Sequence, residues 1–123
     1  MGTVLIVEDN DKNMKLARDV LQAKGYATLE AVTGEEGVRL AREKLPDLVL
    51  MDIQLPGING IEAFRQIRAD AKTARIPVVA LTASVTPTDR SEISAAGFDA
   101  FIGKPISIKE FVETVKRLIE GKK

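Results

Sequence analysis

The chain has 123 residues, and its 18 acidic and 18 basic side chains give a formal net charge of zero. It contains no cysteine and no histidine, which excludes disulfides, thiolate nucleophiles, imidazole bases and histidine metal ligands. The neutral balance lacks the basic excess of nucleic-acid-binding domains, and no apolar run is long enough for a membrane span or a secretion signal. We therefore expect one cytoplasmic domain, residues 1–123, that contacts neither nucleic acid nor a membrane directly.

Five segments with strand character alternate with helical segments along the chain. The strands are predicted at residues 3–7, 26–31, 48–51, 77–81 and 100–102. The first, third and fourth are continuous apolar runs, which are typical of parallel strands covered on both faces. The other two are weaker, as expected for the outer strands of a sheet.

A helix is predicted after each strand. The first covers about residues 11–24 and carries Ala17, Val20 and Leu21 on one stripe, with Met14 on its flank. The cap residues that open the other four helices, each three positions before an acid, are Thr33, Asn59, Thr86 and Ser107, and the glycines expected to stop helices are Gly25 and Gly97. Five strand–helix units in this order predict an α/β fold, with a parallel sheet covered by helices on both faces.

Polar residues stand at the carboxyl ends of four of these strands. Glu8 and Asp9 follow the first strand, Asp52 ends the third, Thr82 ends the fourth and Lys104 follows the fifth. Ligands of open α/β sheets bind at this edge, so we expect these side chains to converge.

Taken singly, each of these residues also has an ordinary structural explanation. Glu8 and Asp9 could cap the following helix or lie in its first turn, and Asp52 could cap the turn that follows it. Thr82 could be a loop hydroxyl and Lys104 a surface lysine. Their joint occurrence at one sheet edge favours a shared site.

The chemistry of such a site points to a metal and a phosphoryl group. Carboxylates crowded at one edge repel each other unless a cation lies between them, and oxygen ligands in an open site suit Mg²⁺. Lys104 and Mg²⁺ would neutralise an anion at Asp52, and Thr82 would donate a hydrogen bond to it. An aspartate can attack phosphorus and become an aspartyl phosphate, and this chemistry needs no histidine on the same chain.

Four motifs carry a resemblance to a known family. They are VLIVEDN (4–10), DLVLMDIQLPG (47–57), VVALTA (78–83) and GKP (103–105). With them the chain resembles the response-regulator receiver domain of two-component signalling over essentially its whole length. A closer similarity, to the stand-alone DivK-type regulators, rests on NMKL (13–16), MDIQLP (51–56) and KPIS (104–107).

This resemblance implies a fold, a reaction and a set of ligands. The fold would be flavodoxin-like, with strand order 2-1-3-4-5. Asp52 would accept a phosphoryl group from a histidine kinase or a histidine phosphotransfer protein. Mg²⁺ would be held by Glu8, Asp9, Asp52 and the backbone carbonyl of Gln54, and Lys104 would pair with the phosphate.

The resemblance also implies a switch. Thr82 would move toward the phosphate and Phe101 would swing inward, although Phe101 could instead be a simple core aromatic. The bond between Lys104 and Pro105 is expected to be cis. The helix predicted after Thr86 carries few large apolar residues, so its packing should be shallow and easily shifted.

Two protein-contact surfaces are expected. Met14, Leu21 and Pro105 are candidates for docking the histidine protein, with edge-of-core packing as the alternative for the two helix residues. The fourth helix, fifth strand and fifth helix would contact downstream protein targets. Since no output domain follows the fifth helix in this sequence, we expect a stand-alone switch or a phosphorelay intermediate; the alternative is a receiver excised from a hybrid kinase or a larger regulator.

Other functions of related architecture fit the sequence less well. A haloacid-dehalogenase-type phosphatase needs a second carboxylate two residues after its nucleophile, where this chain has Gln54. An FMN binder needs a neutral loop after the first strand, and a dinucleotide-binding domain needs G-x-G-x-x-G there. We therefore expect no enzyme beyond self-catalysed phosphoryl transfer and slow hydrolysis, while an adaptor that is not phosphorylated remains an alternative.

Overall fold

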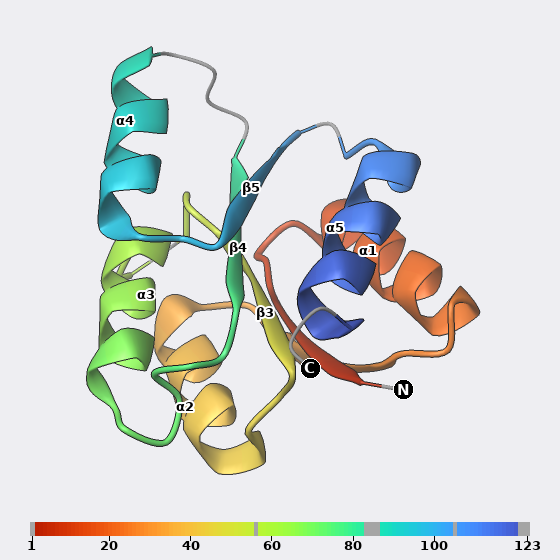
Figure 1. Cartoon of the computed structure of the whole chain (residues 1–123), viewed down its shortest axis with the longest axis horizontal. Helices are drawn as coiled ribbons and strands as arrows, with labels where there is room; N and C mark the ends of the chain where they lie inside the picture. Colours follow the sequence, from red (N-terminus) through yellow and green to blue (C-terminus); the bar gives the residue numbers. More distant parts are fainter. Residues whose placement is uncertain (1, 56, 83–86, 105, 121–123) are drawn as a thin grey trace.

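Strands and helices alternate along the chain (Figure 1). The computed structural model describes residues 2–55, 57–82, 87–104 and 106–120. The strands are β1 (Thr3–Val7), β2 (Ala27–Ala31), β3 (Leu48–Asp52), β4 (Val78–Thr82) and β5 (Ala100–Gly103). The helices are α1 (Asp11–Ala23), α2 (Gly34–Lys44), α3 (Gly60–Ala69), α4 (Pro87–Ala96) and α5 (Ile108–Glu120). Within the described ranges, no helix has the length and apolar character needed to cross a bilayer.

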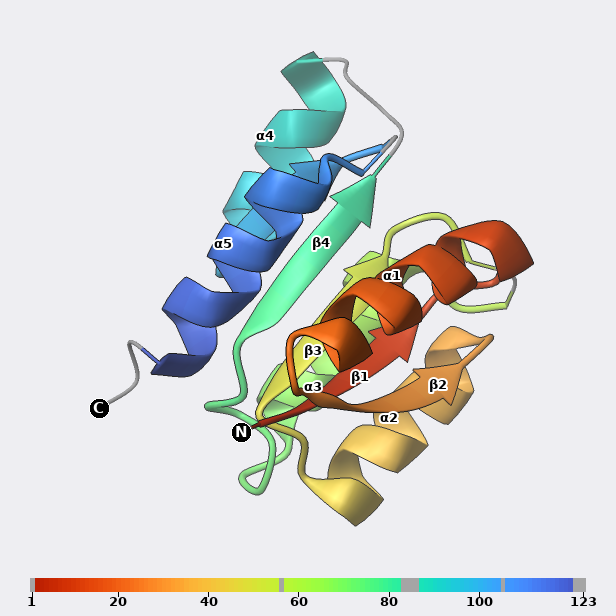
Figure 2. The same cartoon turned by 90° about the vertical axis from the view of Figure 1, so that its right-hand side faces the viewer.

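The five strands form one parallel sheet in the order β2-β1-β3-β4-β5. Figure 2 shows β2, β1, β3 and β4 side by side in this order. This order confirms the flavodoxin-like prediction. It also places the two weakest strand segments at the edges, where each pairs on one side only. Every residue of β3 and β4 is buried, whereas β2 is partly exposed along most of its length.

Both faces of the sheet are covered by helices, with α1 and α5 on one side and α2, α3 and α4 on the other (Figure 1). Alternate strand residues point to opposite faces, so Val4 and Ile6 pack against the α1/α5 side while Leu5 and Val7 pack against the α2/α3 side. This two-sided burial explains why the central strands are continuous apolar runs.

Several local signals act as the sequence indicates. The side chains of Thr33 and Asn59 accept hydrogen bonds from the third backbone amides of α2 and α3. Gly25 and Gly97 have φ values of 93° and 99°, a left-handed conformation that glycine adopts without steric cost. The cap predicted at Thr86 lies outside the described residues.

Gly60 lets the start of α3 close against the end of β3. Its backbone amide donates to the Ile53 carbonyl at 3.0 Å. A Cβ at this position would lie 2.8 Å from Ile53 Cα and would collide with the Asp52 carbonyl oxygen. Both obstacles are backbone atoms, so no side-chain rotation would relieve them.

Replacing Gly60 with alanine should therefore destabilise the fold, even though alanine favours helix formation. We expect the free energy of unfolding to fall by about 2 kcal/mol through overpacking. Urea denaturation measures this change. The control is Gly103→Ala, because a Cβ at Gly103 meets nothing within 4 Å. Equal stability of the two variants would contradict the packing role of Gly60.

Candidate functional site

Neighbouring strands bring the predicted site residues together at the carboxyl edge of the sheet. Glu8 directly follows β1, Asp52 and Thr82 are the last residues of β3 and β4, and Lys104 directly follows β5. One carboxylate oxygen from each of Glu8, Asp9 and Asp52 lies within 4.8 Å of the others. Glu8 and Asp52 are buried, and Asp9 is exposed. The acidic cluster is thus a half-open cup with two buried walls.

Lys104 is the cation of this cup. Its Nζ lies 2.7 Å from Glu8 Oε1 and 3.0 Å from Asp52 Oδ2. The Lys104 side chain is 14% exposed, so the three charges interact with little solvent between them. The Lys104 amide donates to the Thr82 carbonyl at 2.8 Å, and this bond fixes where the lysine leaves β5. Lys104 is therefore not an ordinary surface lysine.

The two oxygens of Asp52 have different partners. Oδ2 faces Lys104, while Oδ1 accepts a hydrogen bond from the Gln54 backbone amide at 3.0 Å. The second contact is the turn cap that the sequence offered as an alternative for Asp52. The structure therefore combines both interpretations: the turn orients the carboxylate, and the cup surrounds it.

Glu8 is oriented by the loop before α1. The Asn10 amide donates to Glu8 Oε2 at 3.2 Å, and the Asn10 side chain accepts from the Asn13 amide at 3.0 Å. The cap of α1 is thus Asn10, not Glu8 or Asp9, which leaves both acids available to the cup. Sequence reasoning missed this role of Asn10. An Asn directly before the first helical residue is a common N-cap signal, because its side chain can accept from the backbone amide three positions later.

Crowding changes the protonation of the cup. Burial, together with the adjacent Asp52 carboxylate, raises the pKa of Glu8 to about 7, while Lys104 acts in the opposite direction. Burial lowers the pKa of Lys104, but its close contacts with the Glu8 and Asp52 carboxylates outweigh that effect, and the net direction is upward. One ammonium therefore does not fully offset the repulsion between the carboxylates.

The donor set fits a hard divalent cation. Glu8 Oε1 is buried and accepts no regular hydrogen bond from any described residue, although the Lys104 ammonium lies 2.7 Å away. Oxygen ligands from two buried acids and one exposed acid would leave room for coordinated water, which Mg²⁺ retains in most protein sites. The Gln54 backbone lies beside Asp52, as its amide contact shows.

The switch candidates occupy distinct environments. Thr82 is buried at the end of β4, one residue beyond Leu81, which pairs with Asp52 in the sheet register. Phe101 on β5 is 42% exposed, so Phe101 is not a core aromatic in this conformation. Pro105, and with it the expected cis bond, lies outside the described residues.

The docking residues expected on α1 are buried. Leu21 is 0% exposed and Met14 6% exposed, and both belong to the core between α1, α5 and the sheet. The packing alternative therefore describes them, and neither side chain offers a contact surface in this conformation. The helical stripe of apolar residues carried the correct signal, since such a stripe normally faces the core.

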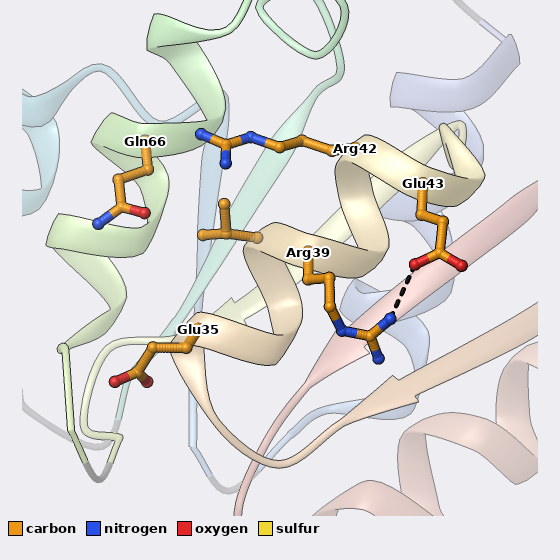
Figure 3. Close-up of a pocket in the computed structure, with 6 residues that line it drawn as sticks. Glu35, Arg39, Arg42, Glu43 and Gln66 are labelled. Carbon is orange, nitrogen blue, oxygen red and sulfur yellow. Dashed lines mark hydrogen bonds and ion pairs between the residues drawn. The ribbon is translucent and has the colours of Figure 1, made fainter.

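A groove of about 390 Å³ lies between α2 and α3, away from the acidic cup (Figure 3). Arg42 extends from α2 toward α3, and its Nε lies 3.0 Å from an oxygen of Asp70. Arg39 pairs with Glu43 at 2.7 Å. Both arginines of the groove are thus already paired, which makes this groove a poor site for a charged ligand.

The contacts of Lys104 with Glu8 and Asp52 should contribute to the stability of the fold. Replacing Lys104 with methionine removes the only ammonium that contacts Glu8 and Asp52 among the described residues. At pH 8 and without divalent cations, we expect a loss of about 2 kcal/mol in the free energy of unfolding, because two buried carboxylates lose their partner. Below pH 7 Glu8 holds a proton, so the loss should shrink at pH 5.5.

Urea denaturation at both pH values measures this difference. The matched control is Lys15→Met, because Lys15 pairs with Asp19 at an exposed position, where 68% of the lysine side chain is accessible. An exposed pair is screened by solvent and contributes little to stability, and its loss should not depend on pH in this range. A pH-independent loss for Lys104→Met would contradict the crowding argument.

The chain matches proteins of known class over nearly all of its length. It is 47% identical over 114 residues to the polar-differentiation response regulator DivK of Brucella ovis, which covers 93% of each chain. Among solved structures, it is similar to the receiver domain of a signal transduction histidine kinase from Syntrophus aciditrophicus, with a TM-score of 0.93 and 32% identity. That match covers 100% of this chain and 93% of the other.

A second solved structure bears on the cup. It is the receiver domain of a sensor histidine kinase from Pseudomonas aeruginosa, which has a magnesium ion coordinated in its active site cleft. The TM-score is 0.91 and the identity 34%, over 97% of this chain and 98% of the other. Residues 4–116 match the model of the response regulator receiver domain. The acidic edge, the strand order and these matches agree: the chain belongs to the receiver-domain family of two-component response regulators.

Proposed function

We propose that this chain is a phosphorylation switch in which Asp52 accepts a phosphoryl group from a phosphohistidine on a partner protein. The observation that carries the proposal is the placement of Asp52. Its carboxylate is buried beside Glu8, contacts Lys104 at 3.0 Å and is oriented by the Gln54 amide. An oriented carboxylate beside a fixed ammonium suits attack on an anionic phosphoryl group.

The transfer needs few protein groups. One oxygen of Asp52 attacks phosphorus, the bond from phosphorus to the partner's imidazole nitrogen breaks, and the imidazole leaves with that electron pair. Lys104 offsets the negative charge of the phosphoryl oxygens, and Thr82 donates a hydrogen bond to one of them. Positioning and charge neutralisation account for most of the rate in such transfers, so the absence of histidine on this chain is no obstacle.

Glu8, Asp9, Asp52 and the Gln54 carbonyl would hold Mg²⁺. When bound, the ion neutralises charge on the acceptor and on the incoming phosphoryl group. The support comes from the half-open oxygen cup, the buried Glu8 oxygen without a regular hydrogen bond, and the magnesium ion in the similar Pseudomonas domain.

Hydrolysis of the aspartyl phosphate should be slow. Rapid hydrolysis needs a general base next to the acyl phosphate, and the residue two positions after Asp52 is the amide Gln54. We therefore assign the chain a signalling role with self-catalysed transfer, not that of a hydrolytic enzyme. A long-lived phosphorylated state suits a protein that acts by binding others.

The partners are proteins. A histidine kinase or a histidine phosphotransfer protein would supply the phosphoryl group, and the face formed by α4, β5 and α5 would contact downstream proteins. The match to DivK covers 93% of each chain, which supports one receiver domain over residues 1–123, and we assign this domain to the cytoplasm. The likeness to receiver domains of histidine kinases favours a phosphorelay as the second candidate, which would use the same site.

Phosphorylation can be tested with a small donor. Incubation with acetyl phosphate and Mg²⁺ should add one phosphoryl group, seen as a mass increase of the intact chain. Asp52→Asn should lose at least about 90% of this incorporation, because an amide is not a nucleophile toward phosphorus. Asp99→Asn is the matched control, since Asp99 directly precedes β5 and lies at the amino edge of the sheet, opposite the edge that carries Asp52. Full incorporation in Asp52→Asn would show that the acceptor is another residue.

Mg²⁺ affinity should depend on pH through Glu8. The raised pKa of about 7 means that the ion competes with a proton below pH 7. We expect the affinity to fall about tenfold between pH 8 and pH 6, with nearly one proton released per ion at pH 6. Calorimetric titration in two buffers of different ionisation enthalpy counts the protons. Glu8→Gln should bind weakly at both pH values, and unchanged wild-type affinity between them would refute this dependence.

A further inference from the structure

Helix α4 is held unevenly along its length. It lies beside α3 on one face of the sheet (Figure 1). Among its described side chains, residues 91–96, only Ile93 is buried. By comparison, α3 buries Ala63, Phe64 and Ile67. The described part of α4, residues 91–96, therefore has few apolar contacts to resist displacement.

The carboxyl end of α4, in contrast, is tied down by aromatic contacts. Gly97 ends the helix with its left-handed backbone, and Phe98 follows directly. The rings of Phe98 and Phe64 stack, with centroids 4.1 Å apart and planes inclined by 22°. The guanidinium carbon of Arg68 lies 4.8 Å from the centroid of the Phe64 ring, so a cation covers the same stack.

Asp99 ties the same turn to the sheet. Its Oδ2 lies 2.6 Å from Arg68 Nη2 and accepts from the Val78 amide at 2.8 Å, while its own amide donates to the Val78 carbonyl at 3.0 Å. Arg68 also donates through Nη1 to the Ile76 carbonyl. Arg68 and Asp99 thus join α3, the start of β4 and the turn after α4 at one point.

We propose that Phe64, Arg68, Phe98 and Asp99 form a pivot for α4. This inference rests on the proposed switch at Thr82. Val78 and Thr82 are the two ends of β4, so the pivot lies at the amino edge of the sheet, roughly 13 Å from the phosphorylation edge. A displacement at the Thr82 end therefore turns α4 about its fixed carboxyl end instead of translating the whole helix.

The geometry of the helix sets the size of the movement. Ten residues span about 15 Å, so a shift of about 2 Å at the amino end corresponds to a rotation of roughly 8°. Displacement falls toward zero at the pivot. A partner that reads the amino half of α4 would sense phosphorylation, whereas one bound at its carboxyl end would not.

The test is amide hydrogen exchange by NMR, with and without Mg²⁺ and beryllium fluoride, a mimic of the phosphoryl group on Asp52. In the unmodified chain, the change in amide exchange should be largest at residues 91 and 92 and should decrease toward residue 96, while the Asp99 amide keeps its rate within about twofold. In Arg68→Met, the same addition should speed exchange at Asp99 by at least about tenfold, because the end of α4 is released.

Arg65→Met is the matched control, since it removes the same charge from an exposed position on α3. Should Arg68→Met fail to fold, Asp99→Asn provides a second variant that removes the ion pair and keeps an oxygen for the Val78 amide. Two results would overturn the pivot. One is a change in exchange rate at the Asp99 amide of the unmodified chain that is as large as the change within α4. The other is the same exchange rate at Asp99 in Arg68→Met and in Arg65→Met after the mimic is added.

Failure of the proposed function gives a different result. In that case acetyl phosphate would not label Asp52 in the unmodified chain, and no amide would respond to the mimic. If labelling is intact and Arg68→Met is labelled within about twofold of the unmodified rate, the result at Asp99 reports on the pivot alone.

Discussion

The structure depends on two buried carboxylates, Glu8 and Asp52, that share one ammonium, Lys104. Parallel strands force this meeting, because β1 and β3 are hydrogen-bonded neighbours whose carboxyl ends lie at the same edge. Burial of Glu8, together with the neighbouring Asp52 carboxylate, raises the pKa of Glu8. The fold therefore collects negative charge at one edge of the sheet, which is the kind of site that a divalent cation stabilises.

The sheet and the grouping of the site residues could be predicted from the sequence, because they depend on local apolar patterns and on the order of the strands. Continuous apolar runs indicate buried parallel strands, and such strands place the residues after them at one edge. That rule alone groups Glu8, Asp52, Thr82 and Lys104 without any distance. The same rule does not predict how the side chains are oriented. Which oxygen of Asp52 faces Lys104 depends on the turn to Gln54, and the spacing of residues does not reveal that turn.

Met14 and Leu21 show the same limit of sequence patterns, because the sequence left both docking and core packing open for them and the structure places both in the core. A residue on or beside an apolar stripe can face the core or the solvent, and the packing of a distant helix decides which. Here α5 closes over that side of the sheet, and Phe111 and Val115 lie in the same core cluster as both residues. Sequence patterns carry periodicity, but they do not contain the position of a second helix.

The two ends of β4 explain how one small domain can be both rigid and responsive. At the carboxyl end, Thr82 sits beside a charged site whose ionic content changes on phosphorylation. At the amino end, Arg68 and Asp99 hold the turn after α4 through charged hydrogen bonds and an aromatic stack. Between these ends, Ile93 alone is buried among the described side chains of α4. A helix fixed at one end, with a single buried side chain among the residues described, is a part of the fold that can change at low energetic cost. A change of charge at the sheet edge therefore reaches the surface first through α4.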